Sequence, residues 1–284
     1  MLRRNKRDVQ GGLILRIAVL VKQVPAVDTV KIDEKSGTMV RDGVEAELNP
    51  PDLHAVEAAV SIKEKSGCEN IEITAFTMGP PQARKVVSYA VAMGCDKAVL
   101  ISDRKFGGAD TLATARTLSK AIMKEGPFDL IFAGERATDG ETGQVGPAVA
   151  EFLHMPVLTF VSSIESLGDG MITVVRSVEG GREKVAAPLP AFVIPVKEIN
   201  SPRLCTLSGK LRAKAAAVTE LNAEDIGLKD EYAGLKGSAT QVVKVTYPKI
   251  TRKGRKITAA ADFSGAVETL LTILEEKGFT EVGK

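Results

Sequence analysis

The stretch Asp129-Leu-Ile-Phe-Ala-Gly134, followed by Glu135-Arg-Ala-Thr-Asp-Gly-Glu-Thr-Gly-Gln-Val-Gly146 and an apolar run through Leu153, decides the fold. This pattern predicts a buried strand, a glycine-rich turn and a helix. Four glycines in the turn let the backbone approach a ligand closely, and the following helix directs its free N–H groups at the same place. Such a junction favours the binding of phosphate.

Acidic side chains in this loop limit how a phosphate can bind there. Three carboxylates would repel it, so main-chain N–H groups must dominate. We expect the Thr142 hydroxyl and the Gln144 amide to assist with a diphosphate, and an acid to face either ribose hydroxyls or Arg136. A glycine-rich turn that binds nothing is the alternative, because glycine loops are weak motifs.

Composition excludes several classes of function. The 284-residue chain is long enough for one large domain, or for one domain with an appendage. A net charge of +2, no tryptophan and 4% aromatic residues provide neither a general attraction to nucleic acid nor a base-stacking surface. The cysteines Cys68, Cys95 and Cys205 lack C-x-x-C spacing, so we expect no metal site and a reducing, cytoplasmic location. No stretch approaches the roughly 20 apolar residues that cross a bilayer, so we expect no membrane-spanning segment.

Short apolar runs alternate with longer helical ones, which is typical of an α/β protein. The continuous apolar strands predict a mostly parallel, doubly wound sheet, whose ligands bind beyond the carboxyl ends of the strands. A β-hairpin is expected over residues 171–178 and 182–186, joined by Glu179-Gly-Gly181. The expected strands are residues 16–21, 71–76, 98–101, 130–133 and 192–195, and the expected helices are residues 53–65, 82–93, 111–124 and 144–153.

Three turns after predicted strands should converge in space: Val21-Lys-Gln-Val-Pro25, Thr77-Met-Gly-Pro80 and the loop from Gly134 to Gly146. Met78 is either an apolar wall for an adenine ring or a core methionine at the end of a strand. Asn49 and Asp52 begin another helix, where capping is their simplest role.

Seven motifs resemble the β subunit of electron transfer flavoprotein, over nearly the whole chain from about Leu15 to Ala215. They follow the order and spacing of that family. A stand-alone nucleotide-binding protein of the universal-stress type shares a similar sheet and turn, but the later motifs argue against it. The motifs are Val21-Lys-Gln-Val-Pro25, Leu48-Asn-Pro50, Met78-Gly-Pro-Pro-Gln82, Ala90-Val-Ala-Met-Gly-Cys-Asp96, Gly108-Ala-Asp-Thr111, Asp139-Gly-Glu-Thr-Gly-Gln-Val-Gly-Pro147 and Asn200-Ser-Pro-Arg203.

The resemblance implies an ETF-type sheet, similar to that of the adenine-nucleotide α-hydrolases, in a heterodimer with an α subunit that carries an electron-shuttling FAD. This chain would bind a second nucleotide. In the housekeeping branch of the family that nucleotide is AMP, without redox work. In the bifurcating, FixA-like branch it is a second FAD that takes hydride from NADH and passes electrons to ferredoxin or flavodoxin and to the α-subunit FAD.

Two features favour the bifurcating branch. The segment Val30-Lys-Ile-Asp-Glu-Lys-Ser-Gly-Thr-Met-Val-Arg-Asp-Gly43 resembles the hairpin that this branch places over its flavin. The nucleotide loop has Gly143-Gln-Val-Gly146 where the AMP-binding branch usually has an Asn-Gln-Thr-Gly run.

The resemblance also implies a set of cofactor-binding residues, none of which acts as an acid or a base. The isoalloxazine would lie near Lys22, Val24 and Arg41, where a cation favours the anionic form of a reduced flavin. The full set is Leu20, Lys22, Val24, Arg41, Asn49, Asp52, Met78, Gly134, Glu135, Arg136, Ala137, Thr138, Asp139, Gly140, Glu141, Thr142, Gly143, Gln144 and Val145.

The segment after Asn200 matches the position of the family's recognition loop, which inserts a leucine into an acyl-CoA dehydrogenase partner. Leu207 falls at that place, between Arg203 and Lys210, and an apolar residue with a charged rim suits docking. A plain linker is the alternative. We therefore expect a basic extension over residues 1–12, a nucleotide-binding domain over 13–199, and a recognition loop and arm over 200–284 that packs on the α subunit.

Overall fold

The computed structural model describes residues 14–26, 46–65, 70–243, 254, 256–260 and 262–279. It divides the chain into two compact units, Met1–Lys244 and Val245–Lys284, which are described separately. The expected basic extension, the 30–43 segment with Arg41, and Cys68 lie outside the described residues.

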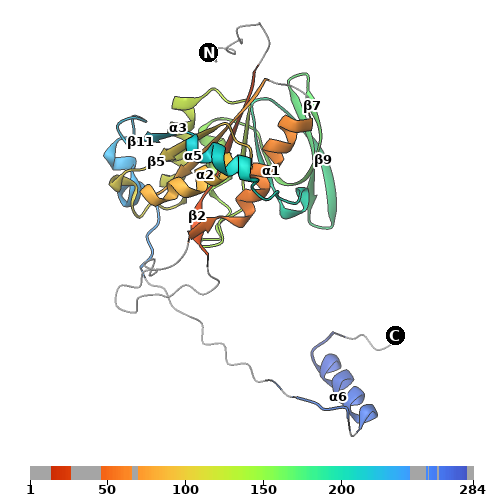
Figure 1. Ribbon diagram of the computed structural model, residues 1–284. Coiled ribbons are helices and arrows are strands. Elements are labelled where there is room, and N and C mark those ends of the chain that lie inside the picture. Colours follow the sequence, from red (N-terminus) through yellow and green to blue (C-terminus); the bar gives the residue numbers. More distant parts are fainter. Residues whose placement is uncertain are drawn as a thin grey trace. The chain divides into compact units, whose positions relative to one another are not determined.

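The first unit is built on one nine-stranded sheet in the order β11-β5-β4-β1-β6-β10-β7-β8-β9 (Figure 1). The pairs from β11 to β7 are parallel, while β7, β8 and β9 pair antiparallel. The predicted α/β class with a mostly parallel sheet is therefore confirmed. In chain order the strands are β1 Leu15–Leu20, β4 Ile71–Met78, β5 Lys97–Ile101, β6 Leu130–Ala133, β7 Val157–Gly168, β8 Met171–Val178, β9 Gly181–Pro188, β10 Ala191–Pro195 and β11 Val218–Leu221.

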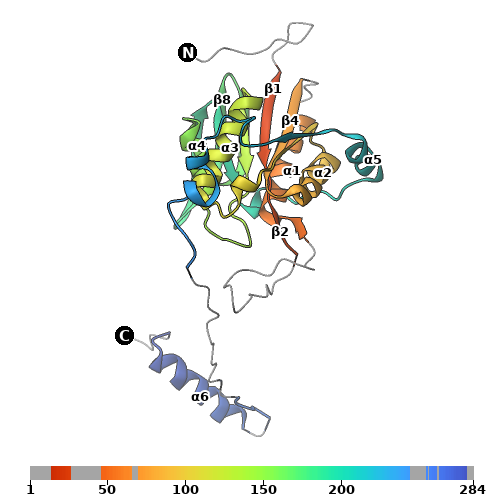
Figure 2. The same cartoon turned by 90° about the vertical axis from the view of Figure 1, so that its left-hand side faces the viewer.

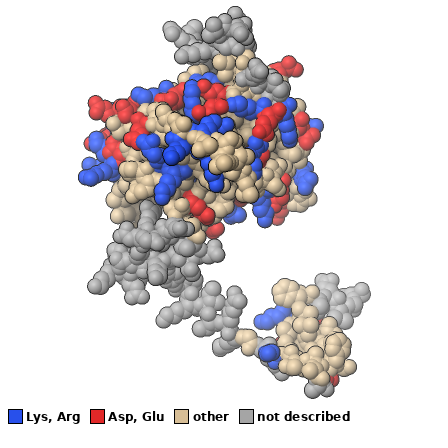
Figure 3. All heavy atoms as spheres, in the orientation of Figure 1, with Lys and Arg blue, Asp and Glu red and all other residues tan. Residues whose placement is uncertain are grey.

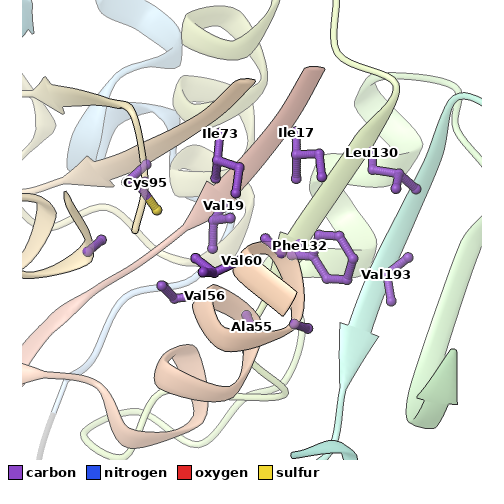
Figure 4. Close-up of a cluster of buried hydrophobic side chains, with 14 of the residues drawn as sticks. Ile17, Val19, Ala55, Val56, Val60, Ile73, Cys95, Leu130, Phe132 and Val193 are labelled. Carbon is purple, nitrogen blue, oxygen red and sulfur yellow. The ribbon is translucent and has the colours of Figure 1, made fainter. Parts of the chain in front are cut away.

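Helices cover both faces of the sheet, as Figure 2 shows on either side of β1. Side chains of a strand point alternately to the two faces, so successive residues of β1 belong to different cores. Ile17 and Val19 pack in a cluster with α1 and α2 (Figure 4), whereas Ala18 and Leu20 pack in a cluster with α3 and α4. The helices of this unit are α1 Pro50–Lys65, α2 Arg84–Met93, α3 Thr111–Glu125, α4 Val145–Phe152 and α5 Leu207–Ala215.

The order of the parallel strands reverses beside β1. The chain moves from β1 to β4 and β5 on one side, and then returns through α3 to β6 on the other side of β1. Ligands of doubly wound sheets bind in the crevice outside the carboxyl ends of the strands at such a reversal. The carboxyl ends of β1 and β6 therefore mark the expected place for a ligand.

Several strands were not predicted from the sequence. Strand β7 extends the predicted hairpin into a three-stranded antiparallel ribbon. Strand β11, in the segment expected to form an arm, pairs with β5 at the edge of the sheet. A small antiparallel sheet joins β2, Gln23–Pro25, to β3, Ala46–Leu48.

The second unit contains the helix α6, Phe263–Glu276. The Asp262 side chain caps it by accepting a hydrogen bond of 2.9 Å from the Gly265 amide. Within the described part of the chain, no helix combines the length and the apolar character needed to span a membrane.

Candidate nucleotide-binding site

The turns that follow β1 and β6 lie against each other. The Lys22 ammonium, directly after β1, contacts a carboxylate oxygen of Asp139 in the glycine-rich loop at 2.6 Å. The turn after β4 is also close, since the Val21 amide donates to the Phe76 carbonyl at 2.8 Å and the Gln23 side chain donates to the Gln82 carbonyl at 3.4 Å. The carboxyl ends of these three strands thus form one surface.

Asp52, in the first turn of α1, lies buried between the ends of β1 and β6. Its carboxylate accepts a hydrogen bond of 2.7 Å from the Lys22 amide. Burial raises the pKa of Asp52 to about 7, against the lowering effect of hydrogen bonds from Asn49, Lys22 and Gly134. Asp52 therefore links both strand ends to α1 and is a buried carboxyl that titrates near neutral pH.

Asn49, just before α1, connects this helix to the glycine-rich loop. Its side-chain nitrogen donates to the Arg136 carbonyl at 2.9 Å, and its side-chain oxygen accepts from the Thr138 amide at 3.0 Å. Its own amide donates to the Lys22 carbonyl at 2.9 Å. The structure thus uses the polar atoms of Asn49 and Asp52 to shape the site from within.

The four loop glycines have different roles. A Cβ on Gly134 would lie 2.7 Å from the Asp52 amide nitrogen, and a Cβ on Gly146 would lie 2.8 Å from the Ile194 side chain, so these two permit close packing within the protein. Gly143 has a φ of 62°, in the left-handed region that favours glycine. A Cβ on Gly140 would meet nothing within 4 Å, so the loop is open there.

Three consecutive main-chain N–H groups in the exposed part of the loop are available to a ligand. Among the described residues, the amides of Thr142, Gly143 and Gln144 have no acceptor within the protein. They directly precede α4, whose first turn adds the positive end of a helix dipole. This donor set suits a phosphate group, so the residues present fit the nucleotide expected here.

Cations neutralise part of the acidic character of the loop. Asp139 pairs with Lys22, and Glu135 pairs with Arg136 at 3.5 Å, which is one of the two arrangements expected for an acid of this loop. Glu141 is exposed, with a φ of 51°. The net negative charge near the free amides of residues 142–144 is therefore smaller than the three carboxylates of the loop sequence suggest.

The other predicted site residues lie around this surface with different exposure. Leu20 and Val24 are buried, and the Gln144 side chain accepts a hydrogen bond of 3.0 Å from the Thr111 hydroxyl at the start of α3. Met78 is half-buried and packs against the core beneath α3 and α4. Arg41 lies outside the described residues.

The predicted docking residues lie on a separate surface, along α1, α2 and α5. Leu207 begins α5 with 75% of its surface exposed, close to Leu204 at 87%. Lys210 is exposed as well, and Figure 3 shows Lys and Arg side chains gathered on this face. A cavity of about 580 Å³ lies between this segment and α2, away from the nucleotide loop.

Arg203 acts as an anchor for that docking segment. Its guanidinium binds Glu57 at 2.8 Å and Glu64 at 2.5 Å, both on α1. Burial raises the pKa of Glu57, but hydrogen bonds from Arg203 outweigh it, so this pKa lies below its usual value. Sequence reasoning missed this anchor, and it also missed the contact of 3.1 Å between the His54 ring and the Asn200 side chain.

A doubly wound sheet with free loop amides at its reversal point defines an α/β nucleotide-binding protein. The family model of the electron transfer flavoprotein domain matches residues 36–226, and the chain belongs to this family. Its β subunits form heterodimers with an α subunit, and the family binds flavins or nucleotides.

Relatives span almost the whole chain. It is 43% identical to the caffeyl-CoA reductase–Etf complex subunit CarD of Acetobacterium woodii, over 93% of this chain and 99% of that protein. It is 40% identical, over the same shares, to the electron transfer flavoprotein subunit beta of Thermoanaerobacterium thermosaccharolyticum. The protein FixA of Sinorhizobium fredii is 37% identical over 82% of this chain and 84% of its own length. The chain is thus an ETF β-like subunit of an electron-transfer complex.

Proposed function

We propose that this chain is the β subunit of an electron-bifurcating electron transfer flavoprotein and binds a second FAD on the loop after β6. The observation that carries this proposal is the run of free amides at 142–144 beside the reversal of strand order. Support also comes from relatives whose names place them in reductase complexes, including caffeyl-CoA reductase and acryloyl-CoA reductase. We infer a cytoplasmic complex.

In this proposal the chain holds the cofactor and tunes it without an acid or a base. The amides of Thr142, Gly143 and Gln144 hold the diphosphate, Met78 lies beside the adenine, and Lys22 and Arg41 lie near the flavin ring. When bound, the FAD supplies hydride and single-electron chemistry. Held there by these residues, the flavin would accept hydride from NADH and would supply one electron to ferredoxin or flavodoxin and the other, through the α-subunit FAD, to an acyl-CoA dehydrogenase.

AMP is the second candidate for the same loop, in a structural role. AMP needs only the loop amides and an adenine pocket. The α-subunit FAD would then carry all electrons from acyl-CoA dehydrogenases.

Counting the bound cofactors distinguishes the two candidates. We expect about two FAD per heterodimer when the full chain is co-purified with its α subunit, because each subunit then holds one flavin. The measurement is flavin absorbance of the denatured complex, with chromatographic separation of the released nucleotides. About one FAD together with one AMP would support the structural role, and one FAD with no other nucleotide would contradict a nucleotide site in this chain.

Replacing Leu207 with alanine tests the proposed docking segment. We expect electron exchange with a purified acyl-CoA dehydrogenase to weaken roughly tenfold, because an exposed apolar anchor loses its buried contact area. Flavin content should not change, since Leu207 is remote from the nucleotide loop. Leu235→Ala is the matched control, as this leucine is half-exposed outside α5. An equal loss in both variants would contradict docking through Leu207.

A further inference from the structure

The ion pair between Lys22 and Asp139 connects the two sides of the proposed nucleotide site. Lys22 is held firmly by its main chain, since its amide donates to Asp52 and its carbonyl accepts from Asn49. Its side chain is 46% exposed and reaches the Asp139 carboxylate at 2.6 Å, while the Asp139 side chain is only 11% exposed. The pair therefore joins a fixed cation to a loop that contains the free amides.

Asp139 lies three residues before Thr142, the first of those amides. An anion bound by the amides thus enters the same loop that the Lys22 ammonium already contacts. A carboxylate and a phosphate are the two anions that a lysine binds most readily, and a phosphate of a nucleotide carries the larger charge. The ammonium end of this pair is 46% exposed, so solvent screens the attraction and replacing one partner costs little stability.

We propose that Asp139 competes with the phosphate groups of the nucleotide for Lys22. In the nucleotide-free chain Asp139 neutralises the ammonium and holds the loop against the end of β1. An entering phosphate takes over the ammonium, and Asp139 turns toward solvent. This inference rests on the proposed nucleotide site, but it reassigns Lys22: its ammonium contacts phosphate instead of the flavin ring at which the family resemblance places it.

The ion pair then acts on specificity as well as on affinity. A ligand that carries no phosphate cannot compensate Lys22 for the loss of Asp139, so adenosine leaves the pair intact. A diphosphate compensates fully. Together with the loop amides, the Lys22 cation thus favours adenine nucleotides over adenosine, even though the loop carries three carboxylates.

The test compares two charge-neutralising variants of the same loop in the full chain, co-purified with its α subunit and stripped of the nucleotide on this chain. Asp139→Asn removes a negative charge and frees Lys22. Glu141→Gln removes the same charge from an exposed residue that, among the described residues, forms no ion pair. Calorimetric titrations use ADP, AMP and adenosine as probes.

We expect Asp139→Asn to bind ADP roughly fivefold more tightly than the wild type, and Glu141→Gln to gain no more than about twofold. Lys22→Met, which keeps the apolar stem, should bind ADP roughly tenfold more weakly. Adenosine affinity should stay constant in all three variants. In the absence of ligand, amide hydrogen exchange over residues 135–144 should accelerate in Asp139→Asn and in Lys22→Met, because both release the loop.

Two results would overturn the inference, and they differ in what they imply for the nucleotide site. Equal ADP affinities of Asp139→Asn and Glu141→Gln, with a wild type that binds ADP, would show that Asp139 does not compete for Lys22. Failure of the wild type to bind any of the three probes would remove the proposed site together with the inference. Melting curves of each variant identify a folding defect, and the exchange measurement still tests the ion pair in that case.

Discussion

Replacing Gly134 with alanine is expected to lower the free energy of unfolding by about 3 kcal/mol and to weaken nucleotide binding at least roughly tenfold. The added Cβ would lie 2.7 Å from the Asp52 amide nitrogen and 2.7 Å from the Pro51 carbonyl carbon. Both are main-chain atoms, which cannot rotate away as a side chain can. The end of β6 must separate from α1, and the loop that β6 leads into moves with it. Urea denaturation followed by circular dichroism, with ADP titration, measures both effects.

Gly140→Ala provides the matched control, since it makes the same chemical change in the same loop. A Cβ at Gly140 meets nothing within 4 Å, so its stability should stay within about 0.5 kcal/mol of the wild type. Similar losses in both variants would mean that the loop requires glycine for backbone freedom. In that case, the close approach of Gly134 to α1 would not be the cause.

The parallel strands were predictable from sequence because both of their faces are buried. Strand β6 is buried at all four positions and β10 at all five, so each appears as an uninterrupted apolar run. Strand β7 was missed because exposed and polar residues interrupt its twelve positions. Strand β11 has one buried residue, Leu221, and is defined by pairing with β5, more than a hundred residues earlier. Such pairing leaves no local signal in the sequence.

The location of the candidate site was predictable for a related reason, because the turns after parallel strands meet at one edge of the sheet. The roles of individual side chains were less accessible. Gly134 was expected to let the backbone approach a ligand, and its close packing against α1 was not predicted. Arg203 was expected at a partner surface, and its guanidinium is bound by Glu57 and Glu64. Their sequence separations of 146 and 139 residues hide these contacts from any local pattern.

Asp52 makes the stability of this protein depend on pH with an unusual sign. Burial raises the pKa of Asp52 from 3.8 to about 7. At pH values between these two, the folded chain therefore keeps the proton on Asp52, whereas the unfolded chain has released it. Stability from this group is fully present below about pH 4 and is lost as pH rises through 7. The free energy of unfolding changes in total by on the order of 4 kcal/mol through this group, because one pKa unit corresponds to about 1.4 kcal/mol.

Asp52→Asn removes that titration, so its stability relative to the wild type should change with pH. At pH 5 we expect the variant to be less stable by about 1 kcal/mol, because an amide offers one oxygen where the carboxyl offers two. At pH 8 it should be more stable by about 1.5 kcal/mol, since the wild type, which then carries a buried charge, loses about 2.6 kcal/mol between pH 5 and pH 8. Urea denaturation at four pH values between 5 and 8 measures the difference.

Asp110→Asn is the control for this titration, at an aspartate that caps α3. Burial raises the pKa of Asp110, but hydrogen bonds from the Ala113 and Thr240 amides outweigh it, so this pKa lies below its usual value. Asp110 is therefore ionised in both the folded and the unfolded chain above pH 5, and its variant should lose the same stability at every pH tested. A difference for Asp52→Asn that stays equally constant would show that Asp52 is ionised throughout, with its charge stabilised by the amides of Lys22 and Gly134.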